Sequence, residues 1–360
     1  MIARALLSRS AIPRRLLTSV ARTRESWFEG LAAKPAAQTA AVNVRWGASP
    51  GALEELSVAP DWAPIELVKK LPREEGNPVV AVRVNGVLRG LRDAVGPVPV
   101  ELEFVRFNDA DGKRVFWHSA AHVLGAALER VLGPDVLLCD GPPVLDAEGG
   151  FFYEFYLRRA AGGEAATLPA TFLADLEKEA NSLVSANAPF ERAIGVARDV
   201  AAGGFLDNPF KLDMLASIPE GEGVSVYRCG PFVDLCRGPH VPSTGAFRAF
   251  ALYRVGASHW HPPDGSAVAK GLGSTACTHS QGLLLQRVYG IAFPSPRGLR
   301  EWRDALEAAR ARDHRVIGAR QRLFFFHELS PGSAFLLPHG TRVYNAVRGE
   351  RSSGRACTTR

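Results

Sequence analysis

The stretch FWHSAAHVLGAALERVLG, residues 116–133, decides how we interpret the chain. Its apolar residues recur at helical spacing from Trp117 to Leu132 and form one stripe, made of Ala121, Leu124, Leu128, Val131 and Leu132. At the helical repeat, His118, His122, Gly125 and Glu129 align on a second face beside that stripe. We therefore expect a helix packed on one side, with two imidazoles on its rim and Gly125 leaving their approach open.

A second stretch, VDLCRGPHVPSTG at residues 233–245, complements the first. Gly238 and Pro239 make a helix improbable there, so Cys236 and His240 are expected on a loop that could face the histidine pair. Two histidines, a cysteine and a third histidine could form a tetrahedral zinc set. They could equally form a metal-free pocket that activates water, because histidine titrates near neutrality. Helix-surface histidines and a core cysteine are the third interpretation, and the residues alone leave all three open.

The rest of the chain alternates strand-like and helix-like segments, which predicts an α+β fold. Residues 79–91, VVAVRVNGVLRGL, predict a hairpin around Asn85-Gly86, residues 100–107 a strand and residues 64–71 a helix, followed by a turn at 108–113. Residues 149–157 predict a strand and 168–186 an amphipathic helix, whereas 190–235 predict short strands and turns. A long helix is expected at 298–322, and the last 13 residues have no apolar period.

Composition and charge narrow the class of protein. With 46% hydrophobic and 22% charged residues among 360, the chain is not disordered throughout, and no apolar run approaches the roughly 18 to 20 residues of a membrane-spanning helix. The net charge of +6 comes from six arginines in residues 1–24, which contain no acid; without them, 37 basic residues face 37 acidic ones. A nucleic-acid surface must therefore be local.

The N-terminus has the composition of a targeting segment. It is arginine-rich, lacks acids and has an amphipathic apolar side, as organellar transit peptides do. We expect a mitochondrial leader, with a plastid leader or a basic arm as alternatives, and an alanine-rich linker up to residue 45. Five cysteines without paired spacing agree with a reducing compartment.

Seven ordered motifs give the chain a family resemblance. They are FWHSAAHVLGAALERVLG, GGFFYEF (149–155), NPFKL (208–212), VDLCRGPHVPSTG, LQRVYGIAFP (285–294), RDHRVIGARQRLFFFHELSPG (312–332) and FLLPHGTRVYNA (335–346). Together they resemble threonyl-tRNA synthetase of the organellar type, over roughly residues 60 to 347. The resemblance implies a ubiquitin-like TGS domain at 46–108, an editing domain at 109–297, a linker helix at 298–323, the start of a class II core at 324–347 and an unmatched tail at 348–360.

The resemblance also implies an editing pocket and its residues. His118, His122, Cys236 and His240 match its quartet, and Lys211, Asp234 and Tyr153 match its lysine, aspartate and tyrosine. Lys211 and one of the helix histidines would activate water against the ester carbonyl, while His240 and Asp234 would orient the terminal adenosine and the seryl group. Cys236 would narrow the pocket against threonine's methyl group. Without the resemblance, Lys211 reads as an ordinary surface lysine.

Editing has a physical reason in this family. One methyl group separates threonine from serine, which is worth about 1–3 kcal/mol, so a second sieve must hydrolyse Ser-tRNA(Thr). The pocket is expected to work without metal, whereas a zinc-dependent pocket of the alanyl type is the rival. ATP, magnesium and zinc are implied only for an aminoacylation core beyond residue 347, and homodimers are implied for the full-length family.

Two further expectations concern RNA and an insertion. Arg303, Arg310 and Arg315 lie on the expected helix and could contact tRNA phosphates, although acidic neighbours could neutralise them. Residues 261–281 are rich in Gly, Ser and Ala and are expected to be an unstructured insertion. A catalytically inactive tRNA-binding or regulatory fragment is the alternative to an editing hydrolase.

Overall fold

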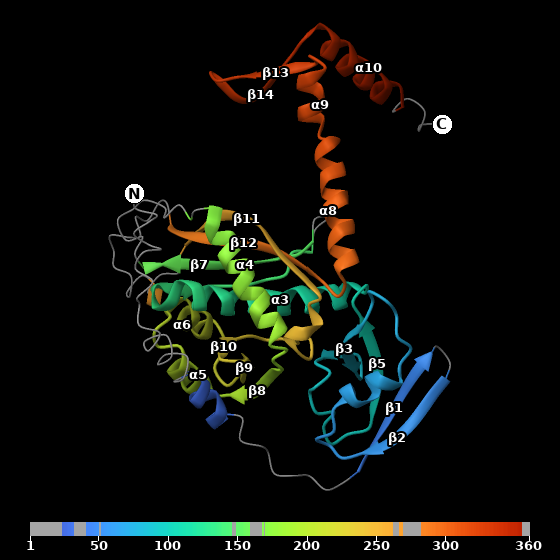
Figure 1. The fold of residues 1–360 in the computed structure, drawn as a ribbon, viewed down its shortest axis with the longest axis vertical. Coiled ribbons are helices and arrows are strands. Elements are labelled where there is room, and N and C mark those ends of the chain that lie inside the picture. Colours follow the sequence, from blue (N-terminus) through green and yellow to red (C-terminus); the bar gives the residue numbers. More distant parts are fainter. Residues whose placement is uncertain are drawn as a thin grey trace. The chain divides into compact units, whose positions relative to one another are not determined.

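The computed structural model describes residues 24–31, 41–49, 52–145, 149–158, 168, 170–261, 266–268 and 282–354. The chain forms two compact units, residues 1–299 and 300–360 (Figure 1). Sheets and helices alternate along the chain, which confirms a mixed α+β architecture at that level. Among the described residues no helix is both long and apolar enough to cross a bilayer.

A small sheet module begins the first unit. Its strands are β1 (Val42–Ser49), β2 (Ala52–Val58), β3 (Val79–Val84), β4 (Val87–Arg89) and β5 (Val100–Arg106), in the order β2-β1-β5-β3-β4. The β1–β5 pair is parallel and the other pairs are antiparallel. The helical turn η1 (Pro64–Lys70) packs Leu67 into the core beside Trp46. The module therefore begins at Val42, ahead of the boundary expected at residue 46.

The hairpin predicted at Asn85-Gly86 is confirmed. Both residues have positive φ, 50° and 79°, as a type I′ turn requires. Asn85 also accepts a hydrogen bond from the backbone of Glu101, which ties the turn to β5.

Helix α3 (Ala110–Leu132) is the central element of the first unit. It starts inside the segment 108–113 expected to be a turn, because Gly112 lets the first turn pass close to β5. A Cβ at Gly112 would lie 1.8 Å from the Arg106 carbonyl oxygen. Residues 115–128 are buried except His118, so the expectation of a helix packed on one side only is wrong.

Two sheets cover α3, as Figure 1 shows. The four-stranded sheet has the order β11-β12-β7-β6, with β6 (Val136–Leu138), β7 (Phe151–Leu157), β11 (Ala249–Trp260) and β12 (Leu283–Phe293). The three-stranded sheet has the order β10-β9-β8, with β8 (Phe190–Val196), β9 (Val224–Cys229) and β10 (Phe232–Leu235). Helix α4 (Ala170–Ser185) packs on α3 and β11, which confirms the helix predicted near 168–186.

The segment 190–235 contains two helices that the sequence did not predict. They are α5 (Arg198–Gly204) and α6 (Pro209–Ala216). The Asn208 side chain accepts hydrogen bonds from the backbone of Phe210 and Lys211 and so caps α6, with Pro209 at its first position.

Part of the expected N-terminal linker is an ordered helical segment. Residues 24–31 are helical, and Phe28 is 1% exposed in a core shared with β8, β9 and α5. Arg24 forms ion pairs with Glu129 at 2.9 Å and with Asp207 at 2.7 Å. The linker expectation is therefore wrong for 25–31, and Arg24, the last residue of the expected leader at 1–24, belongs to the same helical segment. Residues 1–23 of the expected leader and 32–40 of the expected linker lie outside the described residues.

The expected insertion is also partly ordered. Ser266 and Val268 are buried, and the Asp213 carboxylate accepts the backbone N–H groups of Ala267 at 2.5 Å and Val268 at 3.2 Å. The prediction of an unstructured insertion is wrong for 266–268, whereas 262–265 and 269–281 lie outside the described residues.

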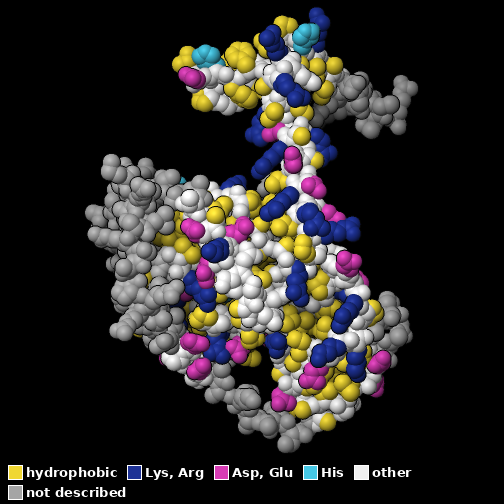
Figure 2. Space-filling view, viewed as in Figure 1, with side chains coloured by type: hydrophobic (Ala, Val, Ile, Leu, Met, Phe, Trp, Pro, Cys, Tyr) yellow, Lys and Arg dark blue, Asp and Glu magenta, His cyan; other side chains and the backbone are white. Residues whose placement is uncertain are grey.

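The expected long helix at 298–322 is two helices. They are α8 (Pro296–Ala311) and α9 (His314–Arg320), and the Asp313 carboxylate between them accepts the Arg315 backbone N–H and so starts α9. The second unit continues with the hairpin β13 (Phe324–His327) and β14 (Ser330–Leu336). Helix α10 (Pro338–Gly354) extends into the tail at 348–360, in which the sequence showed no apolar period. In Figure 2, basic and acidic side chains alternate over α8 and α9.

Candidate active site

Four of the predicted site residues converge at the middle of α3. One ligand atom from each of His118, His122, Cys236 and His240 lies within 4.8 Å of the others. Helix α3 supplies the first two residues one turn apart, and the loop after β10 supplies the other two. We call these four residues the front cluster. The loop position of Cys236 and His240 confirms the prediction made from Gly238 and Pro239.

The Cys236 thiol is the hub of the front cluster. Its Sγ lies 2.9 Å from Nε2 of His118 and 3.3 Å from Nε2 of His240, and it accepts the Gly238 backbone N–H at 3.2 Å. The His118 and His240 rings stack at 4.8 Å, and His122 packs edge-on against His240 at 4.3 Å. The thiol has one hydrogen for two imidazoles, so only one of them can accept from it.

Ser119 fixes the tautomer of one of these imidazoles, that of His240. Its hydroxyl lies 2.7 Å from the Val115 carbonyl, which can only accept, and 3.0 Å from the Val241 N–H, which can only donate. With its hydrogen given to Val115, Ser119 Oγ must accept from Nδ1 of His240, 3.0 Å away. We assign the Nδ1–H tautomer to His240 on this ground, which leaves its Nε2 free to accept the Cys236 thiol hydrogen.

Burial keeps the front cluster neutral. It lowers the pKa of His122 to about 3, and it lowers the pKa of His240 well below its usual range. Burial also lowers the pKa of His118, although the Asp140 carboxylate and a backbone hydrogen bond with Gly141 act against it. For Cys236, burial raises the pKa to about 12, so the thiol is protonated at neutral pH. The three imidazoles are thus neutral at pH 7.

Behind the front cluster lies a charged group that we call the rear cluster, made of Tyr153, Lys211 and Asp234. Lys211 Nζ lies 2.7 Å from Oδ1 of Asp234, and the Tyr153 hydroxyl donates to Oδ2 at 2.6 Å. All three side chains are buried. Burial alone would raise the pKa of Asp234, but the Lys211 charge, His122 and the two hydrogen bonds hold it below its usual range.

Two glycines place the Tyr153 ring. A Cβ at Gly125 would lie 2.7 Å from the ring, and one at Gly141 would lie 2.6 Å from it. The space that the sequence suggested for an incoming ligand at Gly125 is therefore filled by Tyr153. This ring, which β7 carries, delivers its hydroxyl to Asp234.

The seven predicted site residues differ in their exposure to solvent. Only His118 and Cys236 are partly exposed, whereas the other five site residues are buried. Buried Lys211 excludes the interpretation as an ordinary surface lysine. Both ring nitrogens of His240 lie in hydrogen-bond contacts, and both carboxylate oxygens of Asp234 accept hydrogen bonds. That these two residues orient the terminal adenosine and the seryl group stays a prediction.

Three residues of the site were missed from the sequence. Ser119 fixes the His240 tautomer, Phe190 stacks on the His240 ring at 4.8 Å, and Tyr227 packs edge-on against it at 4.4 Å. Ser119 lies directly after His118, and its hydroxyl was the one available signal. Phe190 and Tyr227 read as strand residues, and nothing in their spacing points to His240.

The front cluster has the composition of a zinc site but not its spacing. Zn–N bonds of about 2.0–2.1 Å and Zn–S bonds of about 2.3 Å put N and S about 3.6 Å apart at the tetrahedral angle. His118 Nε2 and Cys236 Sγ are 2.9 Å apart, close enough for direct hydrogen bonding, while other ligand atoms of the set are up to 4.8 Å apart. To bind a zinc ion, the cluster would have to lengthen the His118–Cys236 distance and shorten the longest distances between its other ligand atoms.

The arginines expected to contact tRNA belong to the second unit. Arg303, Arg310 and Arg315 are exposed on α8 and α9. Arg315 is paired with Asp313 at 2.7 Å. This pair agrees with the alternative that acidic neighbours neutralise the arginines of this surface.

Comparisons with known proteins agree on one class. Residues 224–272, which include the loop with Cys236 and His240, match the family described as "Threonyl and Alanyl tRNA synthetase second additional domain". The chain is 42% identical to the mitochondrial threonine–tRNA ligase of Mus musculus over 81% of its length, and 40% identical to that of Homo sapiens over 83%. It is 38% identical to the probable cytoplasmic threonine–tRNA ligase 1 of Dictyostelium discoideum over 79%. These matches cover 36–38% of the relatives, so the chain spans about a third of their length.

Proposed function

This chain is a relative of the threonine–tRNA ligases that carries a tRNA-synthetase second additional domain, and from that premise we propose that it hydrolyses mischarged Ser-tRNA(Thr). The observation that carries the proposal is the front cluster, in which a neutral, partly exposed His118 is in contact with the Cys236 thiol at 2.9 Å. A neutral imidazole at the partly exposed edge of a buried polar cluster is a suitable general base for ester hydrolysis.

The reaction needs one water and one proton path. Water attacks the seryl carbonyl carbon and gives a proton to His118; the bond between that carbon and the ribose oxygen then breaks, and the proton goes to the ribose oxygen. Serine and tRNA with a free terminal hydroxyl are the products. His118 is regenerated in the neutral form, so no other reactant is required.

The rear cluster supplies charge to this step. Lys211 has three N–H groups, of which Asp234 takes one, so the ammonium can also hold the water or the developing oxyanion. Asp234 fixes the position of Lys211, and Tyr153 fixes Asp234. These roles make Lys211 a catalytic residue, and make Asp234 and Tyr153 positioning residues.

Selectivity against threonine is assigned to the partly exposed side of the front cluster. Cys236 is the partly exposed residue opposite His118, so the extra methyl group of threonine would meet its side chain. One methyl group supports about 10- to 200-fold discrimination. The site should therefore hydrolyse the seryl ester about 10- to 200-fold faster than the threonyl ester.

A zinc-dependent hydrolase of the alanyl type is the second candidate, because the front cluster offers three imidazoles and a thiol. In it, these four residues would hold the ion, which would supply a Lewis acid for the ester or a bound hydroxide. The 2.9 Å contact between His118 and Cys236 favours the metal-free site. Metal analysis of purified protein, together with deacylation after treatment with a chelator, decides between them.

The remaining assignments follow the family resemblance. The small sheet module would be a TGS domain, and residues 324–347 would begin a class II core that uses ATP, magnesium and zinc. tRNA(Thr) is the proposed partner, with Arg303, Arg310 and Arg315 as phosphate contacts, and the mitochondrial matrix is the proposed location. Since Phe28 is buried in the first unit, a leader would have to be removed before Arg24.

The test is deacylation of Ser-tRNA(Thr) and Thr-tRNA(Thr) by the purified chain. An editing hydrolase clears the seryl ester and spares the threonyl ester, and His118→Ala abolishes the activity. A tRNA-binding fragment without catalysis binds both and clears neither. If that result were obtained with folded protein, the proposed function would be wrong.

A further inference from the structure

The loop that carries Cys236 and His240 is held from outside its own sheet. The Pro242 carbonyl accepts two hydrogen bonds, one from Nε of Arg92 at 2.9 Å and one from the Phe190 backbone N–H at 3.2 Å. Arg92 belongs to the small sheet module, and Phe190 stacks on the His240 ring at 4.8 Å with an interplanar angle of 16°. The module therefore touches the loop two residues from His240.

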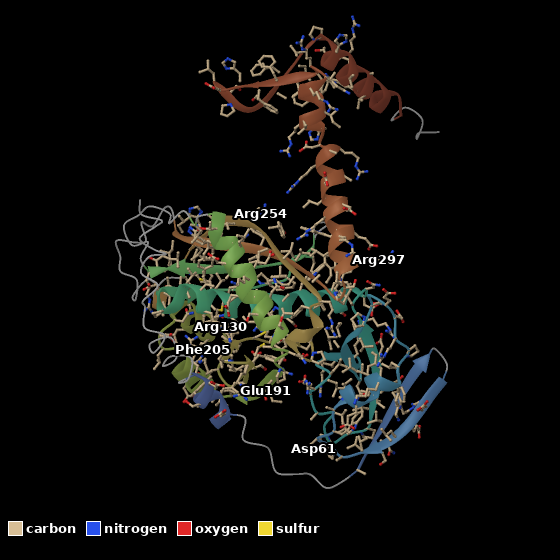
Figure 3. All side chains as sticks on the ribbon, viewed as in Figure 1. Asp61, Arg130, Glu191, Phe205, Arg254 and Arg297 are labelled. Atoms are coloured by element: carbon tan, nitrogen blue, oxygen red, sulfur yellow. The ribbon has the colours of Figure 1, made fainter. Side chains whose placement is uncertain are left out.

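A second connection runs through Arg192 of β8. One of its terminal nitrogens lies 3.2 Å from the Asp93 carboxylate in the small module, and the other donates to the Ser225 hydroxyl at 3.1 Å. Figure 3 labels the neighbouring Glu191, which marks this strand. The Arg192 guanidinium lies over the Tyr227 ring, 5.6 Å from its centre, and Tyr227 packs edge-on against His240 at 4.4 Å.

The Tyr227 hydroxyl is buried and makes no hydrogen bond among the described residues. The strand pairing of β9 fixes its backbone, and ring contacts rather than a hydrogen bond position its side chain. That hydroxyl faces Gly238, where a Cβ would lie 2.0 Å from it. A displacement of Tyr227 would therefore press on the loop between Cys236 and His240.

We infer that Arg92 and Asp93 are positioning residues of the site, which hold His240 and hence the Cys236 thiol through Pro242 and through Arg192 and Tyr227. The inference rests on the proposed function for its catalytic consequence, but the placement of Cys236 can be measured independently. It assigns the small module a part in hydrolysis although none of the module's described residues reaches the front cluster.

The test uses Asp93→Asn, Arg92→Gln and the double variant that carries both. Each is compared with the control Arg45→Gln. Asn keeps an oxygen for the Gly90 N–H that Asp93 binds but removes the charge that Arg192 faces. Arg45 is the matched control, because it lies in the same module and pairs with Glu55 at the surface, 3.7 Å away. Asp93→Glu, which keeps the charge, should recover part of the lost function.

Two readouts are needed. The first is deacylation of Ser-tRNA(Thr). A misplacement of about 1 Å in a site costs about a hundredfold in rate, and a smaller displacement of His240 should lower kcat of the double variant about tenfold with KM little changed. The second is the rate at which iodoacetamide alkylates Cys236, followed by mass spectrometry of its peptide. This rate should rise in the double variant and stay at the wild-type value in Arg45→Gln.

The outcomes separate the inference from the proposed function. If the wild-type chain does not clear Ser-tRNA(Thr) but Cys236 alkylation still depends on Asp93 and Arg92, the positioning inference stands and the proposed function fails. If a folded double variant keeps both its kcat and its alkylation rate, the inference is overturned. The same fall in kcat and the same rise in the alkylation rate in Arg45→Gln would also overturn it.

Discussion

Ser119 Oγ lies 3.0 Å from Nδ1 of His240, and this contact fixes the tautomer of His240 in the front cluster. Ser119 gives its hydrogen to Val115 and accepts those of Val241 and His240, so His240 turns its free Nε2 toward Cys236. The serine that follows the first histidine therefore sets the chemistry of a loop 121 residues away.

Replacing Ser119 by Ala should affect stability and catalysis together. The change leaves the buried Val241 N–H and His240 Nδ1–H without partners, which costs about 1–3 kcal/mol per unsatisfied group. Urea unfolding measures the free energy of unfolding, and deacylation of Ser-tRNA(Thr) should fall with it. Ser185→Ala is the control, because Ser185 makes the same bond to a helix carbonyl, that of Asn181, at the surface. It should cost less than about 0.5 kcal/mol.

The stability of the first unit should decrease as the pH falls below 6.5. In the unfolded chain His122 takes up a proton near pH 6.5, whereas in the folded chain its pKa is about 3. The unfolded state therefore binds more protons between these values, and stability is lost on acidification through this window. His122 alone should contribute about 2 kcal/mol of the loss between pH 7 and pH 5.

The matched variant is His122→Asn, which cannot titrate. Its unfolding free energy should fall less steeply than that of the wild type between pH 7 and pH 5. The depressed pKa of Asp234 acts in the same direction, but only below its ordinary pKa, outside this interval. Parallel curves for the two proteins would mean that His122 is not buried in the neutral form.

The buried pair of Lys211 and Asp234 should depend on both members. Lys211→Met leaves the Asp234 carboxylate buried without its counter-charge and should cost about 3–5 kcal/mol of stability. Adding Asp234→Asn should recover most of that stability without restoring deacylation, which separates the catalytic charge from the structural one. Arg45→Gln, which breaks an exposed pair, should cost at most about 1 kcal/mol. A double variant as unstable as Lys211→Met would contradict the pairing.

Phe28→Ala tests whether residues 24–31 belong to the first unit. The side chain is 1% exposed, so its removal should cost about 3–5 kcal/mol in urea unfolding. Phe326→Ala is the control, because that phenylalanine is 52% exposed. If both substitutions lowered the free energy of unfolding by the same small amount, residues 24–31 would not be part of the folded first unit.

Local sequence patterns predicted which segments form helices and loops better than they predicted which faces of those elements are buried. The histidine spacing and Gly238-Pro239 placed the imidazole pair on a helix and the thiol on a loop, because both depend on backbone geometry alone. The same pattern missed that α3 is covered on two sides. Ala120, Ala126 and Ala127 lie off the apolar stripe and are all buried, since small residues let neighbouring elements approach closely.

Long-range partners escaped the sequence altogether. Nothing near Lys211 announces that Asp234 will face it, and nothing near Arg192 announces Asp93, 99 residues earlier. The break between α8 and α9 was visible in principle, because Asp313 followed by a helical run is a cap signal. The strong helical pattern on either side of it suggested one continuous helix instead.

Hydrolysis of Ser-tRNA(Thr) by metal-depleted protein, measured beside the same reaction with Thr-tRNA(Thr) and with His118→Ala, is the most direct measurement of what this site does. The account predicts release of serine at a rate that survives the chelator, about 10- to 200-fold slower release of threonine, and no release above buffer by the variant. Release that requires added zinc, or that His118→Ala leaves intact, would contradict it.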